Sequence, residues 1–238
     1  IPSAYALLLT NKDTVPRVYY GDMYQDDGQY MQKQSLYFDT ITALMEARKQ
    51  FVAGGQTINV DDNGVLTSVR FGKGAMPAND IGTNETRTQG IGVVIANDPS
   101  LKLSKDSKVT LHMGAAHRNQ NYRALLLTTD NGIDSYSSSK NAPVIKTDDN
   151  GDLVFSNQDI NGQRNTKVHG FLNSEVSGYL SAWVPLDATE QQDARTLPSE
   201  KSVNDGKVLH SNAALDSNLI YEAFSNFQPM PTNRNEYT

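Results

Sequence analysis

The sequence predicts a mainly β fold, an antiparallel sandwich or Greek key, preceded by one unit of the α/β type. From about residue 56, apolar and polar side chains alternate over several short segments, as they do in half-buried strands. No helical periodicity is found between about residues 56 and 210. Asn-Gly pairs, which supply the positive φ of tight hairpin turns, lie between expected strands at 63–64, 131–132 and 150–151.

The first unit is predicted as strand, loop and helix. β-Branched and aromatic residues favour a strand over residues 15–22, which Gly21 ends. Ser35 is the expected N-cap of a helix that runs to about Phe51, and Arg48 near its carboxyl end suits the helix dipole. The apolar side chains of this helix share one face: Tyr37, Ile41, Leu44, Met45, Phe51 and Val52. The helix is expected to stop at Ala53-Gly54-Gly55.

The β region follows. Ser68 and Arg70 are expected on the polar side of one strand, and His112 on the polar side of another. Ile91, Val93 and Ile95 share one face of a third strand. Further strands are expected at 122–129, 153–156, 168–172, 179–184 and 218–224. Residues 190–206 are polar and are predicted to be a linker or a long surface connection.

Composition excludes several classes of protein. The chain has 238 residues and no cysteine, so a disulfide framework, a thiol nucleophile and a Cys-ligated zinc site are excluded. The net charge of −6 and the lack of a Lys/Arg run argue against nucleic-acid binding. The apolar stretch at residues 4–9 is too short to span a membrane.

Motifs for catalysis or metal binding are weak. Residues 72–77 begin like a dinucleotide loop, but Pro77 replaces the third glycine, and a turn is expected instead. Asp148 begins a stretch that looks like a calcium loop, but Leu153 stands where that loop needs glycine, so a hairpin turn is expected. The four histidines show no metal-binding spacing. Six tyrosines crowd the first forty residues; stacking on sugar rings is possible for them, but a core role is favoured: Tyr5, Tyr19, Tyr20, Tyr24, Tyr30 and Tyr37.

The two ends of the chain indicate a piece of a longer protein. It starts at Ile1 without an initiator Met, and it stops at Thr238 just after an apolar segment. We therefore expect further sequence on both sides.

Several stretches resemble the glucansucrases, glycoside hydrolase family 70. The resemblance covers essentially the whole chain and is carried by residues 1–22, 52–56, 66–74, 113–120, 182–185, 211–217 and 220–228. It implies a secreted, multidomain enzyme of lactic acid bacteria that splits sucrose and transfers glucose to an α-glucan with retention of configuration. The catalytic (β/α)8 barrel of this family is circularly permuted. Residues 1–54 would then be the end of the barrel, residues 55–210 the Greek-key domain C, and residues 211–238 the return into the barrel.

The sequence lacks the family's nucleophile, acid/base and transition-state-stabilising motifs, so no catalytic residue is assigned. Because barrel chemistry lies at the carboxyl ends of strands, binding residues are expected at Tyr20, Gly21 and Asp22, and at Asn226 and Gln228. No cofactor or metal is expected in this piece, whereas Ca²⁺ is expected in the whole protein. The expected partners are the rest of the barrel, sucrose and α-glucan acceptors, with no nucleic acid and no membrane.

Two alternatives remain open from the sequence. The whole protein could be a 4,6-α-glucanotransferase that uses starch-type donors, because such enzymes share domain C. The β region could instead be a non-catalytic module that binds carbohydrate or serves only as support. The donor, the linkage specificity, the product size and the oligomeric state are not encoded in any motif we recognise.

Overall fold

The computed structural model describes residues 1–25, 33–62, 64–96, 108–129, 132–137, 140–155 and 179–186, and the backbone of two short strands at 159–160 and 163–164. These residues all belong to the unit Ile1–Gln191. The expected strands at 168–172 and 218–224 and the expected linker at 190–206 lie outside the described residues.

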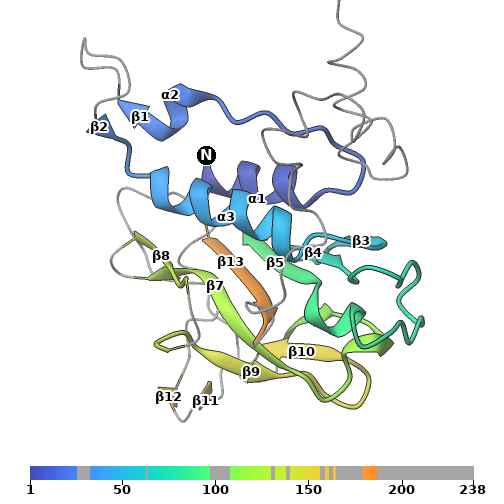
Figure 1. Ribbon diagram of the computed structural model, residues 1–238. Helices are drawn as coiled ribbons and strands as arrows, with labels where there is room; N and C mark the ends of the chain where they lie inside the picture. The colour runs from blue at the N-terminus through green and yellow to red at the C-terminus, as the bar shows by residue number, and fades with distance from the viewer. Residues whose placement is uncertain are drawn as a thin grey trace, which may run out of the picture. The chain divides into compact units, whose positions relative to one another are not determined.

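Two α-helices lie side by side on one face of a β-sheet (Figure 1). They are α1 (Pro2–Thr10) and α3 (Phe38–Gln50). Helix α1 buries Pro2, Tyr5, Ala6 and Leu9, a spacing of three and four residues that places these side chains on one face. The predicted apolar face of α3 is confirmed, because Ile41, Leu44, Phe51 and Val52 are buried, and Tyr37 and Met45 pack against them.

The predicted start of α3 was early. Its N-cap is Tyr37, not Ser35, although the Ser35 hydroxyl accepts a hydrogen bond from the Tyr37 amide at 3.2 Å. The helix ends as expected, with Phe51 as its C-cap and Gly54 at a φ of +75°.

The predicted strand over residues 15–22 is wrong. Residues 15–19 are irregular, and a single helical turn, α2 (Tyr20–Met23), follows. No strand in the described part of the chain pairs with this segment, and a strand requires a neighbour for its backbone hydrogen bonds.

The main sheet has seven antiparallel strands in the order β3-β4-β5-β13-β7-β8, with β9 also paired to β7. Their bounds are β3 (Gln56–Val60), β4 (Leu66–Arg70), β5 (Ile91–Ala96), β7 (Asn121–Thr129), β8 (Gly132–Ser135), β9 (Val144–Lys146) and β13 (Tyr179–Pro185). The mainly antiparallel β class is thereby confirmed, while the Greek-key connectivity stays a prediction.

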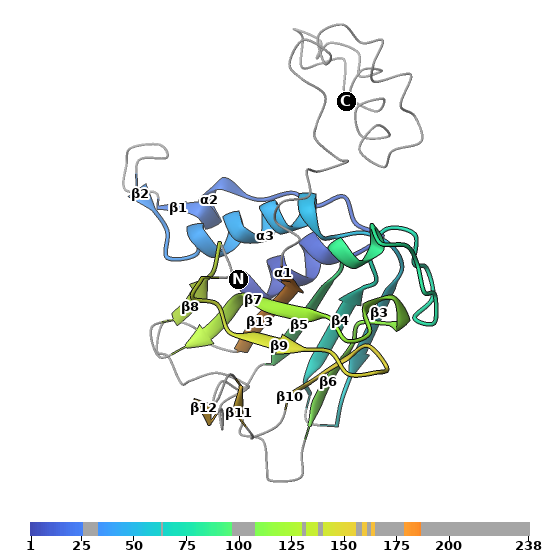
Figure 2. The same ribbon diagram turned by 60° about the horizontal axis from the view of Figure 1, so that its bottom comes forward.

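Short elements complete the described fold. Two strands, β6 (Val109–His112) and β10 (Asp152–Phe155), pair with one another and cover the second face of the main sheet (Figure 2). Single-turn 3₁₀ helices are η1 (Thr86–Thr88) and η2 (Ala115–His117). Four strands of two residues each form two further pairs. β1 (Tyr24–Gln25) pairs with β2 (Lys33–Gln34), and β11 (Asp159–Ile160) pairs with β12 (Gln163–Arg164).

Two of the three predicted Asn-Gly hairpins are confirmed. Gly64 has a positive φ and lies between the paired strands β3 and β4. Gly132 also has a positive φ, but it is the first residue of β8 and is paired with Thr129 of β7. Gly151 also has positive φ and lies in a turn, where the Asp148 amide donates to the Asp152 carbonyl. The flanking strands do not pair with each other, however: β9 pairs with β7 and β10 pairs with β6. The turn therefore forms, but the strands before and after it, β9 and β10, belong to different sheets.

The central strands are buried on both faces. On the helix side, Ile91, Val93 and Leu180 pack against α1 and α3; on the other side, Val94 and Trp183 pack against β6 and β10. Every residue of β13 is buried for this reason. Ile91 and Val93 therefore face one apolar core, and the opposite face of β5 packs against a second apolar core and not against solvent.

The expected polar side of β4 is buried as well. The Arg70 guanidinium lies under α1, where it donates to the Thr10 carbonyl at 3.0 Å and to the Gly54 carbonyl at 2.7 Å. Arg48 of α3 donates to the Leu9 carbonyl at 2.6 Å. Two cations thus satisfy carbonyls at the carboxyl end of α1, which is the favourable end of its dipole. These bonds join α1 to α3 and to the sheet. The predicted division between residues 54 and 55 stays a prediction, and both parts contribute to the helix-side core.

Candidate functional site

The segment from Tyr19 to Asp22 carries the three sequence-predicted site residues that the structure describes. The Tyr5 hydroxyl donates to Asp22 Oδ2 at 2.6 Å and accepts from the Tyr19 amide at 3.0 Å. The Ser35 hydroxyl donates to the Asp22 carbonyl at 2.6 Å. Helix α1 and the residues ahead of α3 therefore fix the position of this turn. Desolvation of Tyr5, and then its hydrogen bond to Asp22, raise the pKa of the Tyr5 phenol, which favours the protonated form that donates to Asp22.

Two exposed tyrosines lie next to Asp22. Tyr19 is 61% exposed and Tyr20 is 39% exposed, with their ring centroids 5.1 Å apart. The predicted core role is correct for Tyr5 and wrong for these two residues, while Tyr24 and Tyr37 are half-buried. Tyr30 lies outside the described residues. An exposed aromatic pair beside a carboxylate can stack on a sugar ring and accept hydrogen bonds from its hydroxyls.

The other predicted site residues, Asn226 and Gln228, lie outside the described residues. The structure therefore brings together Tyr20, Gly21 and Asp22 only.

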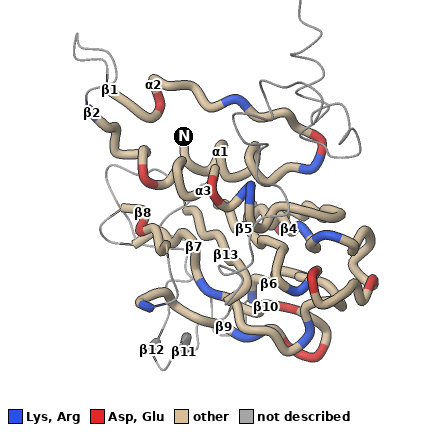
Figure 3. The backbone as a smooth tube through the Cα atoms, viewed as in Figure 1, with Lys and Arg blue, Asp and Glu red and all other residues tan. Residues whose placement is uncertain are grey.

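Within the described part of the chain, no three His, Asp or Glu side chains converge on a possible metal site. No described helix is long and apolar enough to cross a membrane. Lys and Arg positions are interspersed with Asp and Glu positions along the described chain (Figure 3).

Both loop motifs are turns. In residues 72–77 the Ala75 amide donates to the Gly72 carbonyl at 3.2 Å, as the expected turn requires. In the second motif, Asp148 Oδ1 accepts from the amides of Asn150 and Asp152 at 2.8 and 3.0 Å. These backbone hydrogen bonds lower the pKa of the Asp148 carboxyl. The carboxylate is therefore used to close its own turn, as in an Asx-turn.

The histidines divide into two environments. His112 is exposed, as predicted, and its Nδ1 lies 2.9 Å from Asp152 Oδ1. His117 is fully buried, which the sequence did not indicate. Its Nε2 lies 2.7 Å from the Phe71 carbonyl and its Nδ1 lies 2.9 Å from Gln120 Oε1. Gln120 donates in turn to the Arg87 carbonyl. The ring thereby joins the end of β4 to η1 and η2. His169 and His210 lie outside the described residues.

Because His117 is buried, we expect the folded protein to lose stability in acid. Desolvation lowers the pKa of this imidazole, an effect that its two hydrogen bonds reduce but do not reverse. Unfolding returns the ring to its usual pKa of about 6.5. The unfolded state therefore takes up a proton as the pH falls below about 6.5, while the folded state resists it, so the contribution to stability is complete above that pH and is lost below it. We expect faster hydrogen exchange of peptides around residues 71 and 115–120 at pH 5.5 than at pH 7.5, after correction for intrinsic rates.

Two variants test the assignment to His117. His117→Gln should remove this pH dependence, whereas His112→Gln, at an exposed histidine, should leave it unchanged. Increased protection of the same peptides on acidification would contradict the expectation, because it would show that the buried ring is held as an imidazolium between the Phe71 and Gln120 oxygens.

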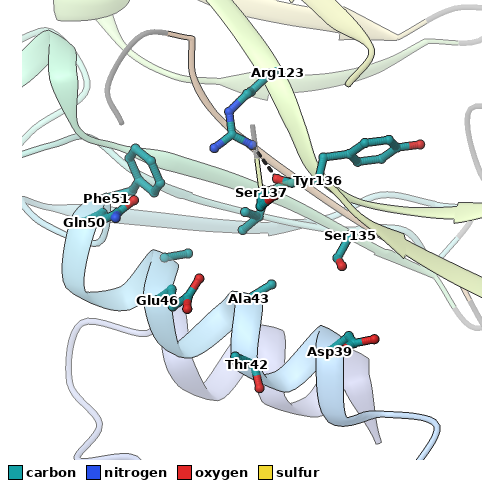
Figure 4. A pocket seen from close by; sticks show the side chains of 12 residues that line it. Asp39, Thr42, Ala43, Glu46, Gln50, Phe51, Arg123, Ser135, Tyr136 and Ser137 are labelled. Carbon is teal, nitrogen blue, oxygen red and sulfur yellow. Dashed lines mark hydrogen bonds between the residues drawn. The ribbon is translucent and has the colours of Figure 1, made fainter. Parts of the chain in front are cut away.

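A groove that the sequence did not predict lies between α3 and the strands β7 and β8 (Figure 4). Its volume is about 400 Å³. Glu46 and Gln50 of α3 line one side, and Arg123 of β7 lines the other. Sequence periodicity placed Arg123 within an expected strand but gave no sign that its side chain would be buried beside a helix.

Comparison with known proteins shows similarity along the whole chain. The family model described as glycosyl hydrolase family 70 matches residues 1–238. Glucosyltransferase-S of Streptococcus mutans serotype c is 49% identical over 252 aligned residues, which cover 100% of this chain and 17% of that protein. The chain therefore spans about one sixth of the length of this curated relative.

Solved structures agree. A truncated alternansucrase from Leuconostoc mesenteroides NRRL B-1355 is 50% identical, with a TM-score of 0.76 over 91% of this chain and 20% of that one. An alternansucrase in complex with isomaltononaose is 51% identical, with a TM-score of 0.77 over 91% of this chain and 19% of that one.

Proposed function

The chain belongs to glycosyl hydrolase family 70, and from this we propose that it is part of a glucosyltransferase that splits sucrose and transfers glucose to a growing α-glucan. The family match over all 238 residues carries the proposal. The names of its relatives, glucosyltransferase and alternansucrase, support it. Retention of configuration requires two carboxylates, one as nucleophile and one as acid/base. No motif for either is found in this sequence, so both would lie elsewhere in the whole protein.

Within that protein, we propose that this chain supports the barrel and contributes one edge of the sugar-binding site. Tyr5 and Ser35 hold Asp22 in place, and Tyr19 and Tyr20 stand exposed beside it. Such an arrangement suits a binding role in which the rings stack on a sugar and the carboxylate accepts its hydroxyls. Arg70 and Arg48 fix α1 to the rest of the structure and so stabilise the support for this turn.

The wider setting of the protein is also a proposal. A secreted enzyme of lactic acid bacteria, with a Greek-key domain C, is what the family resemblance implies. The absence of cysteine is compatible with export from such a cell. Ca²⁺ is proposed for the whole protein, as the family resemblance implies.

The proposal predicts that the 238-residue chain alone is inactive. Incubated with sucrose, it should release no fructose and form no glucan, because it lacks the two carboxylates, whereas the intact protein should do both. Fructose release is measured by a coupled enzymatic assay. Turnover by the isolated chain would contradict the assignment of the catalytic groups to other segments.

The choice of donor is tested on the intact protein. Sucrose should be a substrate and maltoheptaose should not. Activity on maltoheptaose without activity on sucrose would instead identify a 4,6-α-glucanotransferase and would overturn the proposed donor.

A further inference from the structure

The ring of Tyr19 lies against the backbone of Gly21, at a place where any side chain would collide with it. A Cβ atom on Gly21 would lie 2.5 Å from Tyr19 Cε1 and 3.1 Å from its Cζ. Carbon atoms in contact normally lie about 3.5–4.0 Å apart. Gly21 belongs to α2 and does not have a positive φ, so its backbone conformation does not require glycine. The position of the Tyr19 ring does require it.

Other contacts hold the same ring from different directions. The Tyr19 amide donates to the Tyr5 hydroxyl at 3.0 Å, which ties its backbone to α1. The ring of Tyr20 lies beside it, with centroids 5.1 Å apart and the two planes inclined at 56°. Tyr19 is nevertheless 61% exposed. An aromatic ring that is both exposed and held in place loses little freedom when a ligand stacks on it.

The carboxylate of Asp22 adds a polar group to this surface. Its Oδ2 accepts from Tyr5, whereas its Oδ1 has no hydrogen-bond partner in the described part of the chain and is not among the buried unpaired atoms there. Oδ1 can therefore accept from a ligand. An anionic ligand would be repelled by Asp22, and a wholly apolar one would leave Oδ1 unpaired. A glucose ring meets both conditions, because its C–H bonds form an apolar face and its hydroxyls lie at the rim.

We propose that Gly21 is a positioning residue, which holds the Tyr19 ring as the surface on which one glucose unit stacks while Asp22 accepts a hydroxyl at its rim. The identity of the sugar rests on the proposed function. The inference adds that Tyr19, which the sequence did not predict as a site residue, contacts the sugar. It also adds that Gly21 sets the affinity without a contact of its own.

Gly21→Ala in the intact protein tests this role. Alanine has a higher helix propensity than glycine, so the turn at α2 should be retained. Its Cβ should nevertheless displace the Tyr19 ring. We expect the Kd of isomaltotriose, measured by calorimetry without sucrose, to rise about two- to tenfold, the range for loss of one aromatic contact. Hydrogen exchange of peptides within residues 15–25 should not become faster, whereas a purely structural role would make it faster.

Companion variants show whether the effect passes through the ring. Tyr19→Ala should weaken binding at least as much, and Gly21→Ala should then add nothing further, because the two residues act as one unit. Tyr19→Phe retains the ring and should bind like the wild type. Val15→Ala, at a side chain that is 69% exposed in the same segment, should also leave the Kd unchanged.

The outcomes separate this inference from the proposed function. An unchanged Kd in Gly21→Ala or in Tyr19→Ala would overturn the inference, as would a wild-type protein that binds no isomaltotriose. A rise in Kd that comes with faster exchange in residues 15–25, or that persists in the Tyr19→Ala background, would also overturn it. Fructose release from sucrose by the wild type decides the proposed function independently. If fructose is released and these variants have no effect on binding, only the role of Gly21 and Tyr19 is refuted.

Discussion

Trp183→Ala should lower the free energy of opening of the main sheet by about 3–5 kcal/mol, the range measured for truncation of buried large aromatic side chains. Trp183 is 1% exposed and lies in β13, between β5 and β7. Its ring packs 5.1 Å from the ring of Phe155 in β10, and its Nε1 donates to the Ser181 hydroxyl at 3.0 Å. The substitution would therefore remove this aromatic contact between the two sheets and leave the Ser181 hydroxyl without this donor.

Hydrogen exchange of β5, β7 and β13 in the intact protein measures this effect, because it reports local opening and does not require two-state unfolding of the whole molecule. Ile81→Ala, at a side chain that is 76% exposed, is the control and should change the free energy of opening by no more than about 0.5 kcal/mol. Equal exchange in Trp183→Ala and the wild type would show that the Trp183 contact does not limit opening.

Gly55→Ala should destabilise the junction between α3 and the sheet by about 3 kcal/mol or more, at the upper end of overpacking effects. A Cβ on Gly55 would lie 1.7 Å from the Met76 carbonyl oxygen, and that oxygen belongs to the backbone, which cannot rotate away. The Gly55 amide also donates to the Ala75 carbonyl at 2.8 Å, and its own carbonyl accepts from Phe71 at 3.1 Å. Relief of the clash would therefore break hydrogen bonds on both sides.

Gly21→Ala is the matched control for this prediction. Its Cβ would meet only the Tyr19 ring, at 2.5 Å, and that exposed side chain can move. Faster exchange around residues 71–76 is expected in Gly55→Ala and not in Gly21→Ala. Comparable exchange in the two variants would mean that the segment at Met76 can shift at little cost.

Local patterns in the sequence predicted most of the described β region. The hairpin of β3 and β4 and that of β7 and β8 occur where Asn-Gly pairs predicted them, because such a signal depends on a few neighbouring residues. Helix α3 follows from its apolar spacing in the same way. The strand over residues 15–22 failed because side-chain preference alone cannot form a strand that has no partner to bond.

Part of the candidate site could be predicted and part could not. Tyr20, Gly21 and Asp22 were expected to bind because they would follow a barrel strand, but the structure has no strand there, and their binding role stays a prediction. The structure adds that Asp22 is held by Tyr5, seventeen residues away. The groove at Arg123 was missed because polar residues on a strand are expected to face solvent unless a further layer covers them. Helix α3 supplies that layer, and its position on the sheet depends on contacts between distant residues.

The sequence by itself determined the family of this protein, its mainly antiparallel β class and the positions of most strands, because these depend on motifs and on periodicity within short segments. The tertiary structure alone decided which strands are neighbours, as when β13 pairs with both β5 and β7. It also decided that Arg70, His117 and Arg123 are buried. Burial of a charged or titratable group depends on the layers that pack over it from elsewhere in the chain. The sequence pattern of a strand does not show whether one of its faces is covered or both are.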